Sequence, residues 1–342
     1  MFTGITTILP FLSRGTADGP ALDHLIRAAA SALSQTCELP HELLIVDDGS
    51  QPELASLEAV RGLLSKPEVR LLRLAENQGL VYALNAGLTQ ARYDLIARID
   101  GDDVWRPGKL ARQLEAFRLD PDLTLVASSM RLVHPHGAAL DRDEIRAGGW
   151  RETLALCRDI GCPFPHGSIL ARKDVFETLG GYPHSPRFTH CEDYALWTAW
   201  IRFFKVRIIQ PVFLEYTVSS NQISARWTAQ QRKATERVKS SFLDLGNHDH
   251  IPEAIARIAQ GLALPLLQAS KTLSTAWLFY SDIVADASLY EAATIVFPDR
   301  SVHKTGDISQ TVVRNAFYLG GAEGVSESAE REFLGRPRTV ES

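Results

Sequence analysis

The chain has 342 residues, of which 45% are hydrophobic and 23% charged, so its length allows two or three domains and its composition a full core. It carries 36 basic and 41 acidic residues, and the resulting net charge of -5 excludes the broad positive field that nucleic-acid-binding proteins present. Its four cysteines are widely scattered and form no CxxC pair, which indicates neither a zinc site nor a disulfide framework.

The first part of the chain alternates short apolar runs with amphipathic segments. The apolar runs predict strands over residues 5–9, 42–46, 69–74 and 94–99. A helix follows each strand, over residues 21–35, over residues 52–64, through Val81, Leu84 and Leu88, and through Leu110, Leu114 and Phe117. Strands that alternate with helices in this way predict an α/β fold with a doubly wound, mainly parallel, Rossmann-like sheet.

The alternation of strands and helices becomes less regular after Val133, and a turn is expected at residues 134–137. The later predicted elements are a helix over 151–160, a strand over 169–172, a helix ending at Gly180, a helix through Leu196, Trp197, Trp200 and Ile201, and strands over 206–209 and 212–217. A helical C-terminal extension is predicted from residue 225, with helices over 227–245, 252–268 and 274–296, and residues 321–342 are expected to form a flexible tail.

The first predicted strand is followed by residues 10–12 (PFL), and polar residues follow each of the next three. Asp47-Asp48 follows the second strand, Asn77 the third, and the sequence Asp100-Gly101-Asp102-Asp103 the fourth. In doubly wound sheets, ligands bind beyond the carboxyl ends of the strands, so these residues are expected at one rim. Crowded carboxylates repel one another, and their hard oxygens suit Mg or Mn, metals that commonly hold phosphates. The sequence therefore predicts a divalent metal and a phosphate-bearing ligand.

Each acidic cluster also has a purely structural explanation. Asp47-Asp48-Gly49-Ser50 has the composition of a turn, and Asp100 to Asp103 could cap the helix that follows. Glu192-Asp193 stands at a predicted helix start, where the helix dipole favours acids. His166, beside Pro165 and Gly167, fits a turn as well as a ligand contact. Trp197 fits the core, although the apolar face of its ring could stack on a ligand.

Taken together, the motifs resemble the family 2 glycosyltransferases. The resemblance covers roughly residues 4 to 224, and its blocks occur in the right order, which makes the signal specific although each block alone is weak. The blocks are 42–50 (ELLIVDDGS), 77–79 (NQG) with 83–85 (ALN), 100–103 (DGDD) with 107–110 (PGKL), 167–168 (GS), 180–182 (GGY) and 192–194 (EDY).

The resemblance implies a GT-A fold and inverting transfer of a sugar from a nucleotide diphosphate sugar to a hydroxyl of a glycan or a lipid-linked acceptor, in cell-surface polysaccharide biosynthesis. It implies that Asp102 binds the Mg or Mn ion and that Asp193 is the catalytic base, with Asp103 capping the turn. The nucleotide sugar would contact Pro10, Phe11, Leu12, Asp48, Asn77, Gly79, Asp100 and Asp102, and the acceptor-side candidates are His166, Glu192 and Trp197.

Two positions depart from the family pattern. Leu84 stands where members often have Arg, and neither His nor Arg occurs between Tyr216 and Ser224. A third protein ligand to the metal, or a contact to phosphate, is missing from its usual place. The donor diphosphate and water would then complete the metal shell, as is common for Mg.

The resemblance implies a glycosyltransferase domain over residues 1–224, with a nucleotide-sugar half (1–128) and an acceptor half (129–224). The sequence pattern adds a helical region (225–320) and the tail. Because no secretion signal or unbroken apolar span is visible, we expect a cytoplasmic protein, with peripheral contact at the inner face of the membrane left open. The C-terminal helices could form a homodimer. The alternatives are a glycosyltransferase-like binding or scaffold protein and a sugar nucleotidyltransferase, but residues 10–20 lack the Gly-rich, basic loop that the latter class needs.

Overall fold

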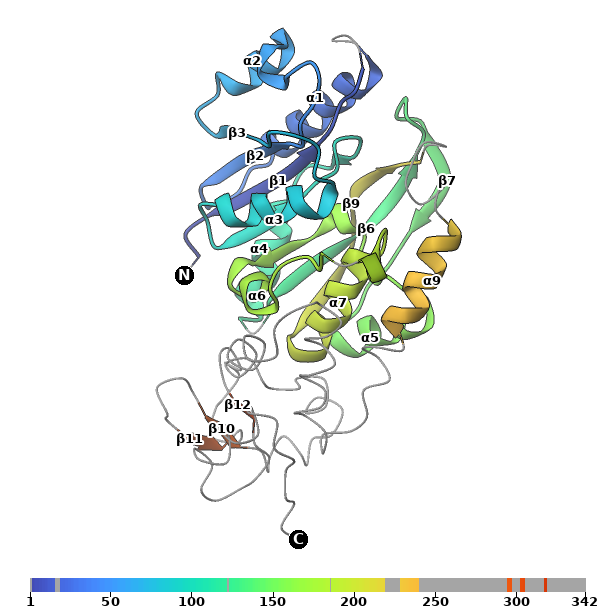
Figure 1. Cartoon of the computed structure of the whole chain (residues 1–342). Helices are drawn as coiled ribbons and strands as arrows, with labels where there is room; N and C mark the ends of the chain where they lie inside the picture. Colours follow the sequence, from blue (N-terminus) through green and yellow to red (C-terminus); the bar gives the residue numbers. More distant parts are fainter. Residues whose placement is uncertain are drawn as a thin grey trace.

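The computed structural model describes residues 2–15, 19–121, 123–184, 186–218 and 228–239, together with three short strands between residues 294 and 318 (Figure 1). The elements of the N-terminal part are β1 (Ile5–Phe11), α1 (Pro20–Leu33), β2 (His41–Asp47), the 3-10 turn η1 (Leu54–Ser56), α2 (Glu58–Leu64), β3 (Val69–Arg73), α3 (Leu80–Gln90), β4 (Leu95–Arg98), β5 (Val104–Trp105) and α4 (Lys109–Leu119).

The chain continues with long strands and three further helices before the last segments. These elements are β6 (Leu125–Val133), β7 (Ala139–Glu144), α5 (Trp150–Asp159), η2 (His166–Ser168), β8 (Leu170–Arg172), α6 (Lys173–Leu179), η3 (Pro186–Phe188), α7 (Glu192–Phe203), β9 (Val206–Thr217), α9 (Thr228–Val238), β10 (Thr294–Val296), β11 (Val302–Lys304) and β12 (Phe317–Tyr318).

Nine strands of the described part form one sheet in the order β3-β2-β1-β4-β8-β6-β9-β5, with β7 paired to β6. The first four strands in this order, up to β4, are mutually parallel, which confirms the predicted doubly wound arrangement. Beyond them, β8 runs antiparallel to β4 and β6, while β6 and β9 are parallel. The expected boundary between residues 128 and 129 falls inside β6, so the two halves share a strand.

The hydrophobic core lies on both faces of the parallel strands. Ile5 and Leu9 of β1 belong to a cluster that includes Leu25 of α1, while Ile8 lies against α3 on the other face. A Cβ atom at Gly87 of α3 would lie only 2.8 Å from Ile8 Cγ2, so the missing side chain lets α3 pack closely. Helices on both faces explain why every residue of β1 is buried.

Several elements differ from the sequence prediction. β5, β6 and β7 were not predicted, β9 is one strand where two were expected, and β11 and β12 lie in the region predicted to be helical. The register between β6 and β9 shifts where Ile209 and Val212 pair with Ser128 and Ser129, and the intervening Pro211 fits such an irregularity. The predicted helix over 274–296 is wrong at its end, because the sequence Thr294–Val296, rich in β-branched residues, forms β10. The predicted helix over 252–268 lies outside the described residues.

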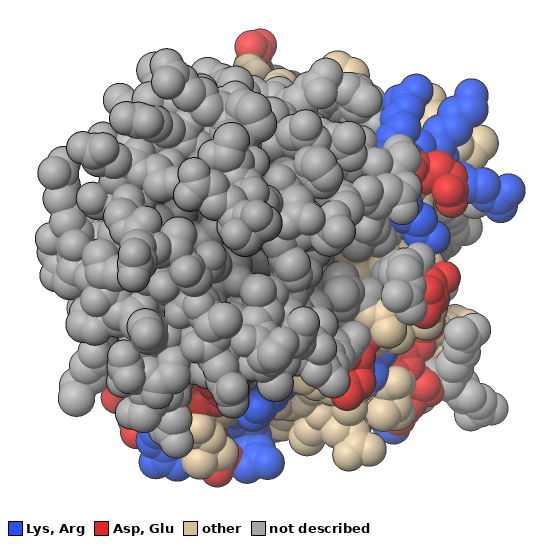
Figure 2. All heavy atoms as spheres, turned by 90° about the horizontal axis from the view of Figure 1, so that it is seen from below, with Lys and Arg blue, Asp and Glu red and all other residues tan. Residues whose placement is uncertain are grey.

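No helix among the described residues has both the length and the apolar composition needed to cross a bilayer. On the coloured part of the face in Figure 2, basic and acidic side chains lie beside one another. This part of the surface therefore carries mixed charge.

Candidate active site at the sheet rim

The motif around Asp48 and the motif around Asn77 form one structural unit. The buried Asp48 carboxylate accepts hydrogen bonds from the backbone N–H groups of Gln78, at 2.8 Å, and Gly79, at 2.9 Å. Gly49 has a φ of 74°, and a Cβ atom there would lie 2.6 Å from Asn77 N, so only glycine fits. The carboxylate thus holds the turn that begins α3.

A second pair of motifs meets between α3 and the turn after α6. The side-chain amide of Asn85 donates to the Tyr182 carbonyl at 2.9 Å, and its oxygen accepts from Tyr182 N–H at 2.8 Å. Gly181, with a φ of 79°, would bring a Cβ atom to 2.5 Å from Asn85 Oδ1. These two hydrogen bonds join residues that are 97 positions apart in the sequence, and they hold the Tyr182 backbone against α3.

Asp103 has a different role from the expected turn cap. Its buried carboxylate accepts a hydrogen bond from Thr217 N–H on β9 at 3.0 Å, and the Thr217 hydroxyl donates to the Asp102 carbonyl. Burial, followed by the charges of Asp100 and Asp102, raises the pKa of Asp103 well above its usual range. Asp103 therefore connects the loop of residues 100–103, called the acidic loop below, to β9.

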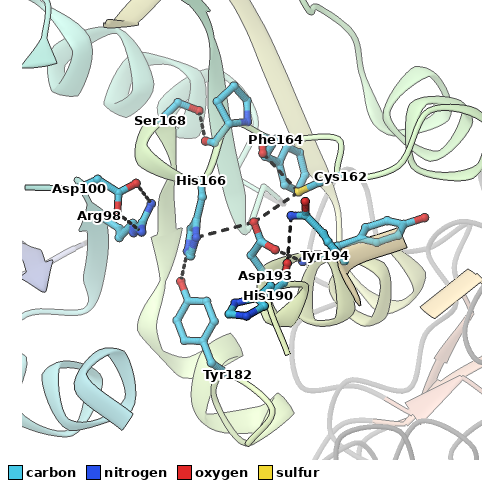
Figure 3. A network of polar contacts seen from close by, with 12 residues as sticks. Arg98, Asp100, Cys162, Phe164, His166, Ser168, Tyr182, His190, Asp193 and Tyr194 are labelled. Atoms are coloured by element: carbon cyan, nitrogen blue, oxygen red, sulfur yellow. Dashed lines mark hydrogen bonds and ion pairs between the residues drawn. The ribbon is translucent and has the colours of Figure 1, made fainter. Parts of the chain in front are cut away.

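Asp100 is bound by a buried arginine at the end of β4. The Arg98 guanidinium donates to both carboxylate oxygens of Asp100, one of them at 2.6 Å, while only 3% of Arg98 is exposed (Figure 3). A buried guanidinium needs a paired anion, and a bidentate pair also fixes the carboxylate plane. Arg98 thus supplies a fixed positive charge next to the acidic loop.

The acidic loop opens into a pocket of about 440 Å³. Asp102 lines this pocket, and burial, followed by the Asp100 charge, raises the pKa of Asp102 to about 6. The carboxylate is therefore costly to ionise without a nearby cation. The lining residues are Leu80, Arg98, Asp100, Asp102, Met130, Arg146, Cys162, Phe164, Pro165, His166, His190, Glu192, Asp193, Tyr216 and Gln231.

Asp193 and Glu192 line the same pocket from the first turn of α7. Asp193 Oδ1 accepts from the N–H of Tyr194 at 2.7 Å, and burial raises the pKa of Asp193. Burial and then the Asp193 charge raise the pKa of Glu192 to about 7. A carboxylate with a raised pKa is a stronger base, which suits proton abstraction near neutral pH.

His166 lies between the Arg98–Asp100 pair and Asp193 in Figure 3. Burial, followed by the Arg98 charge, lowers the pKa of His166 well below its usual range, so the imidazole is neutral. Its Nε2 shares a hydrogen bond with the Tyr182 hydroxyl at 2.7 Å, while 3.8 Å from Nδ1 to Asp193 Oδ2 is too long for one. The neutral ring can accept or donate a hydrogen bond within the pocket.

The candidate residues divide into three groups by location. Asp100, Asp102, His166, Glu192 and Asp193 line the pocket together, and Gly79 lines an adjoining pocket of about 440 Å³ that shares Leu80, His190 and Glu192 with it. The remaining nucleotide candidates line neither of these two pockets: Pro10 and Phe11 are buried at the end of β1, Leu12 is 37% exposed, and Asp48 and Asn77 lie in the neighbouring turns.

Trp197 does not line the pocket, so its prediction as an acceptor-side contact is wrong. Its side chain is fully buried, and its ring packs edge-on against His166 with 5.6 Å between centroids. The helical spacing that marked Trp197 as a core residue was the better signal, because it turns the ring inward from α7.

The prediction assigned no role to Arg98, Arg146 or Gln231, although all three line the pocket. Arg98 carried a usable signal, since a charged residue inside the apolar run of β4 needs a partner. Arg146 donates to the carbonyls of Cys162 and Pro163 at 2.8 and 3.1 Å. These arginines bring positive charge to the pocket.

The side chains of the described pocket supply only part of the ligands that a hard divalent cation needs. Within the described ranges, no group of three His, Cys, Asp or Glu side chains is placed to hold a metal ion. Asp102 nevertheless presents a carboxylate whose pKa is raised by burial and then by the Asp100 charge, and carboxylate oxygens suit Mg or Mn. A metal held by one or two carboxylates, with ligand and water oxygens, is compatible with this arrangement.

We expect Glu192→Gln to change how stability depends on pH. Because the folded-state pKa of about 7 exceeds the usual 4.5, the neutral acid stabilises the fold below that usual value, and this stability is lost as pH rises through 7. At pH 8 the ligand-free variant should be more stable than wild type by about 1 to 3 kcal/mol, after solvent screening is allowed for.

Chemical denaturation at pH 5 and pH 8 measures this difference. The control is Glu58→Gln, which changes an exposed glutamate in the first turn of α2. It should follow the wild-type pH dependence. An equal response of both variants would contradict the burial of Glu192 as the cause.

Residues 21–180 match Glycosyl transferase family 2. The amylovoran biosynthesis glycosyltransferase AmsE of Erwinia amylovora is 29% identical over 156 residues, which cover 46% of this chain and 56% of that protein. The UDP-Gal:alpha-D-GlcNAc-diphosphoundecaprenol beta-1,3-galactosyltransferase of Escherichia coli is 28% identical over 171 residues, which cover 49% of this chain and 59% of that protein. The chain thus spans less than two thirds of the length of either relative.

A solved structure shares the fold. The crystal structure of GalNAc-T7 with UDP, GalNAc and Mn2+ aligns with a TM-score of 0.54 at 14% identity, covering 77% of this chain and 52% of that one. At this identity the likeness concerns the fold alone. The family match identifies residues 21–180 as a glycosyl transferase family 2 segment. The structural likeness shows that the fold is GT-A.

Proposed function

We propose that this chain is an inverting, metal-dependent glycosyltransferase that moves a sugar from a nucleotide diphosphate sugar to an acceptor hydroxyl. The observation that carries the proposal is that Asp100 and Asp102, at the end of β4, share one pocket with Asp193, at the start of α7. One wall thus offers oxygens for a cation and diphosphate, and the other offers a base. The family match over residues 21–180 includes the first wall, and the resemblance of residues 192–194 (EDY) to a family motif supports the second.

Asp193 would act as the base in a single displacement. Its carboxylate takes the proton of the acceptor hydroxyl while the hydroxyl oxygen attacks C1 of the donor sugar. The bond from C1 to the diphosphate oxygen breaks, and its electron pair leaves with the nucleoside diphosphate. Attack from the face opposite the leaving group inverts the configuration at C1.

Asp102 would hold the Mg or Mn ion, with oxygens of the diphosphate and water completing its shell. A bound divalent ion supplies positive charge to the leaving diphosphate oxygens. Arg98 fixes the Asp100 carboxylate beside that position, and its own charge moderates the repulsion among the acids. The shortage of protein ligands in the described part of the chain is met by the substrate itself.

Two relatives support the proposed substrate class. One takes part in amylovoran biosynthesis, and the other is named as a galactosyltransferase acting on a diphosphoundecaprenol-linked sugar. We propose a hydroxyl of a glycan or lipid-linked acceptor in cell-surface polysaccharide biosynthesis. Work on a lipid-linked acceptor would take place at the cytoplasmic face of the membrane, which the chain could reach by peripheral contact.

A binding panel and a product analysis test the function. We expect UDP, GDP, CDP or dTDP, in the presence of Mn2+, to raise the melting temperature, since a ligand at 100 times its dissociation constant stabilises by about 2.7 kcal/mol. Proton NMR of the initial product from the matching nucleotide sugar should show the inverted anomer. No stabilisation by any nucleotide would contradict donor binding, and a retained anomer would contradict the single displacement.

A further inference from the structure

Helix α9 lies outside the segment that matches the family, yet it packs on the candidate site. Ala234 and Val238 are buried, and Gln231 lies one turn earlier on the same face. This spacing is that of an amphipathic helix, and the face packs against η3 and α7. Gln231 itself lines the pocket with Asp193. The site is therefore completed by a helix that the family motifs do not include.

The segment that α9 holds contains a constrained backbone position. His190 has a φ of 64°, the left-handed region that residues other than glycine rarely occupy. It directly precedes Cys191, the N-cap residue of α7, and its side chain lines both pockets. Such a conformation persists only where surrounding contacts hold it, and it is found most often at functional sites.

Two side chains of α9 contact this turn. Gln231 Nε2 donates a hydrogen bond to the His190 carbonyl at 3.0 Å. Thr235, one helical turn later, brings its hydroxyl to 3.5 Å from the Cys191 sulfur. These contacts fix the two residues that come immediately before Glu192 and Asp193, so α9 determines where the first turn of α7 begins.

We propose that Gln231 is a positioning residue for Asp193. By holding the His190 carbonyl, it fixes the left-handed turn and thereby the direction in which the Asp193 carboxylate enters the pocket. This inference rests on the proposed function, because it assigns Asp193 the role of base. A displacement of about 1 Å at a reacting group can lower the rate about 10²-fold, so a remote hydrogen bond can affect turnover.

Gln231→Glu tests the hydrogen bond because glutamate has nearly the same size but its carboxylate cannot donate to a carbonyl. The matched control is Gln230→Glu, which places the same charge on the neighbouring exposed residue of α9. Hydrogen exchange of the full-length, ligand-free protein should be about tenfold faster over residues 186–194 in Gln231→Glu. Exchange in Gln230→Glu should match wild type, and equal exchange in both variants would overturn the proposal.

The kinetic readout separates positioning from simple loss of structure. With UDP-glucose, UDP-galactose, UDP-GlcNAc and GDP-mannose as donor probes, kcat should fall about 10- to 100-fold in Gln231→Glu, while KM for the donor stays within about twofold. An unchanged kcat, or an equal loss of donor affinity, would overturn the proposal. A wild-type protein that releases no nucleoside diphosphate would overturn the proposed function, whereas the exchange experiment still decides whether Gln231 holds the turn.

Discussion

Asp193→Asn should lower turnover by about 10² to 10⁴ while the affinity for the donor stays near the wild-type value. Asparagine keeps an oxygen that can accept the hydrogen bond from the N–H of Tyr194, so the start of α7 should be preserved. What is lost is the negative carboxylate that takes the proton of the acceptor hydroxyl. Initial rates and calorimetric titration with the donor measure the two effects separately.

A matched control is available in the first turn of α1. Asp23→Asn makes the same chemical change at an exposed helix start and should leave both rate and affinity unchanged. If Asp193→Asn weakened donor binding as much as turnover, the carboxylate would be a donor contact and not a base.

Asp102→Ala should abolish the part of donor binding that depends on a divalent metal. The Asp102 carboxylate lies in the pocket with a pKa raised to about 6, and a cation would relieve the cost of its charge. Removing it leaves Asp100, whose carboxylate is already bound by Arg98. Calorimetry with the tightest-binding nucleoside diphosphate, with Mn2+ and with EDTA, should show a metal-dependent difference in wild type and none in the variant.

The control for this variant lies at the opposite end of the same strand. Asp94 precedes β4 and accepts hydrogen bonds from the N–H and hydroxyl of Thr3, at 2.9 and 3.0 Å. Asp94→Ala should keep the metal dependence intact, whatever it does to stability. Mn2+-dependent binding that survives in Asp102→Ala would remove Asp102 from the metal site.

The parallel half of the sheet could be predicted because the hydrophobic pattern of each short segment is enough to identify its strands and helices. Every residue of β1 is buried, and the face of α1 that carries Leu25 and Ala29 has helical spacing, so hydrophobic periodicity was sufficient. β6 and β7 could not be predicted in this way. The interior of β6 contains Ser128, Ser129 and Arg131, and its strand character depends on pairing with β9, far along the chain.

The same division applies to the candidate site. The location of Asp102 and Asp193 in one pocket could be predicted because each lies in a recognisable motif. Asp48 lies in a motif of the same kind but in a neighbouring turn outside both pockets, and the roles of all three residues stay predictions. Gln231 could not be predicted, since its contact with His190 joins residues 41 positions apart. The inward direction of Trp197 likewise depends on packing against His166. A sequence pattern alone left both orientations of its ring open.

The release of nucleoside diphosphate by the full-length chain tests most directly whether this pocket is a metal-dependent transferase site. Wild type, Asp102→Ala and Asp193→Asn would be compared with the four donor probes and candidate acceptors, each with Mn2+ or with EDTA. We predict acceptor-stimulated release by wild type from at least one donor, its loss in EDTA and in Asp102→Ala, and a fall of about 10² to 10⁴ in Asp193→Asn. Wild-type release that continues unchanged in EDTA and in both variants would contradict the assignment.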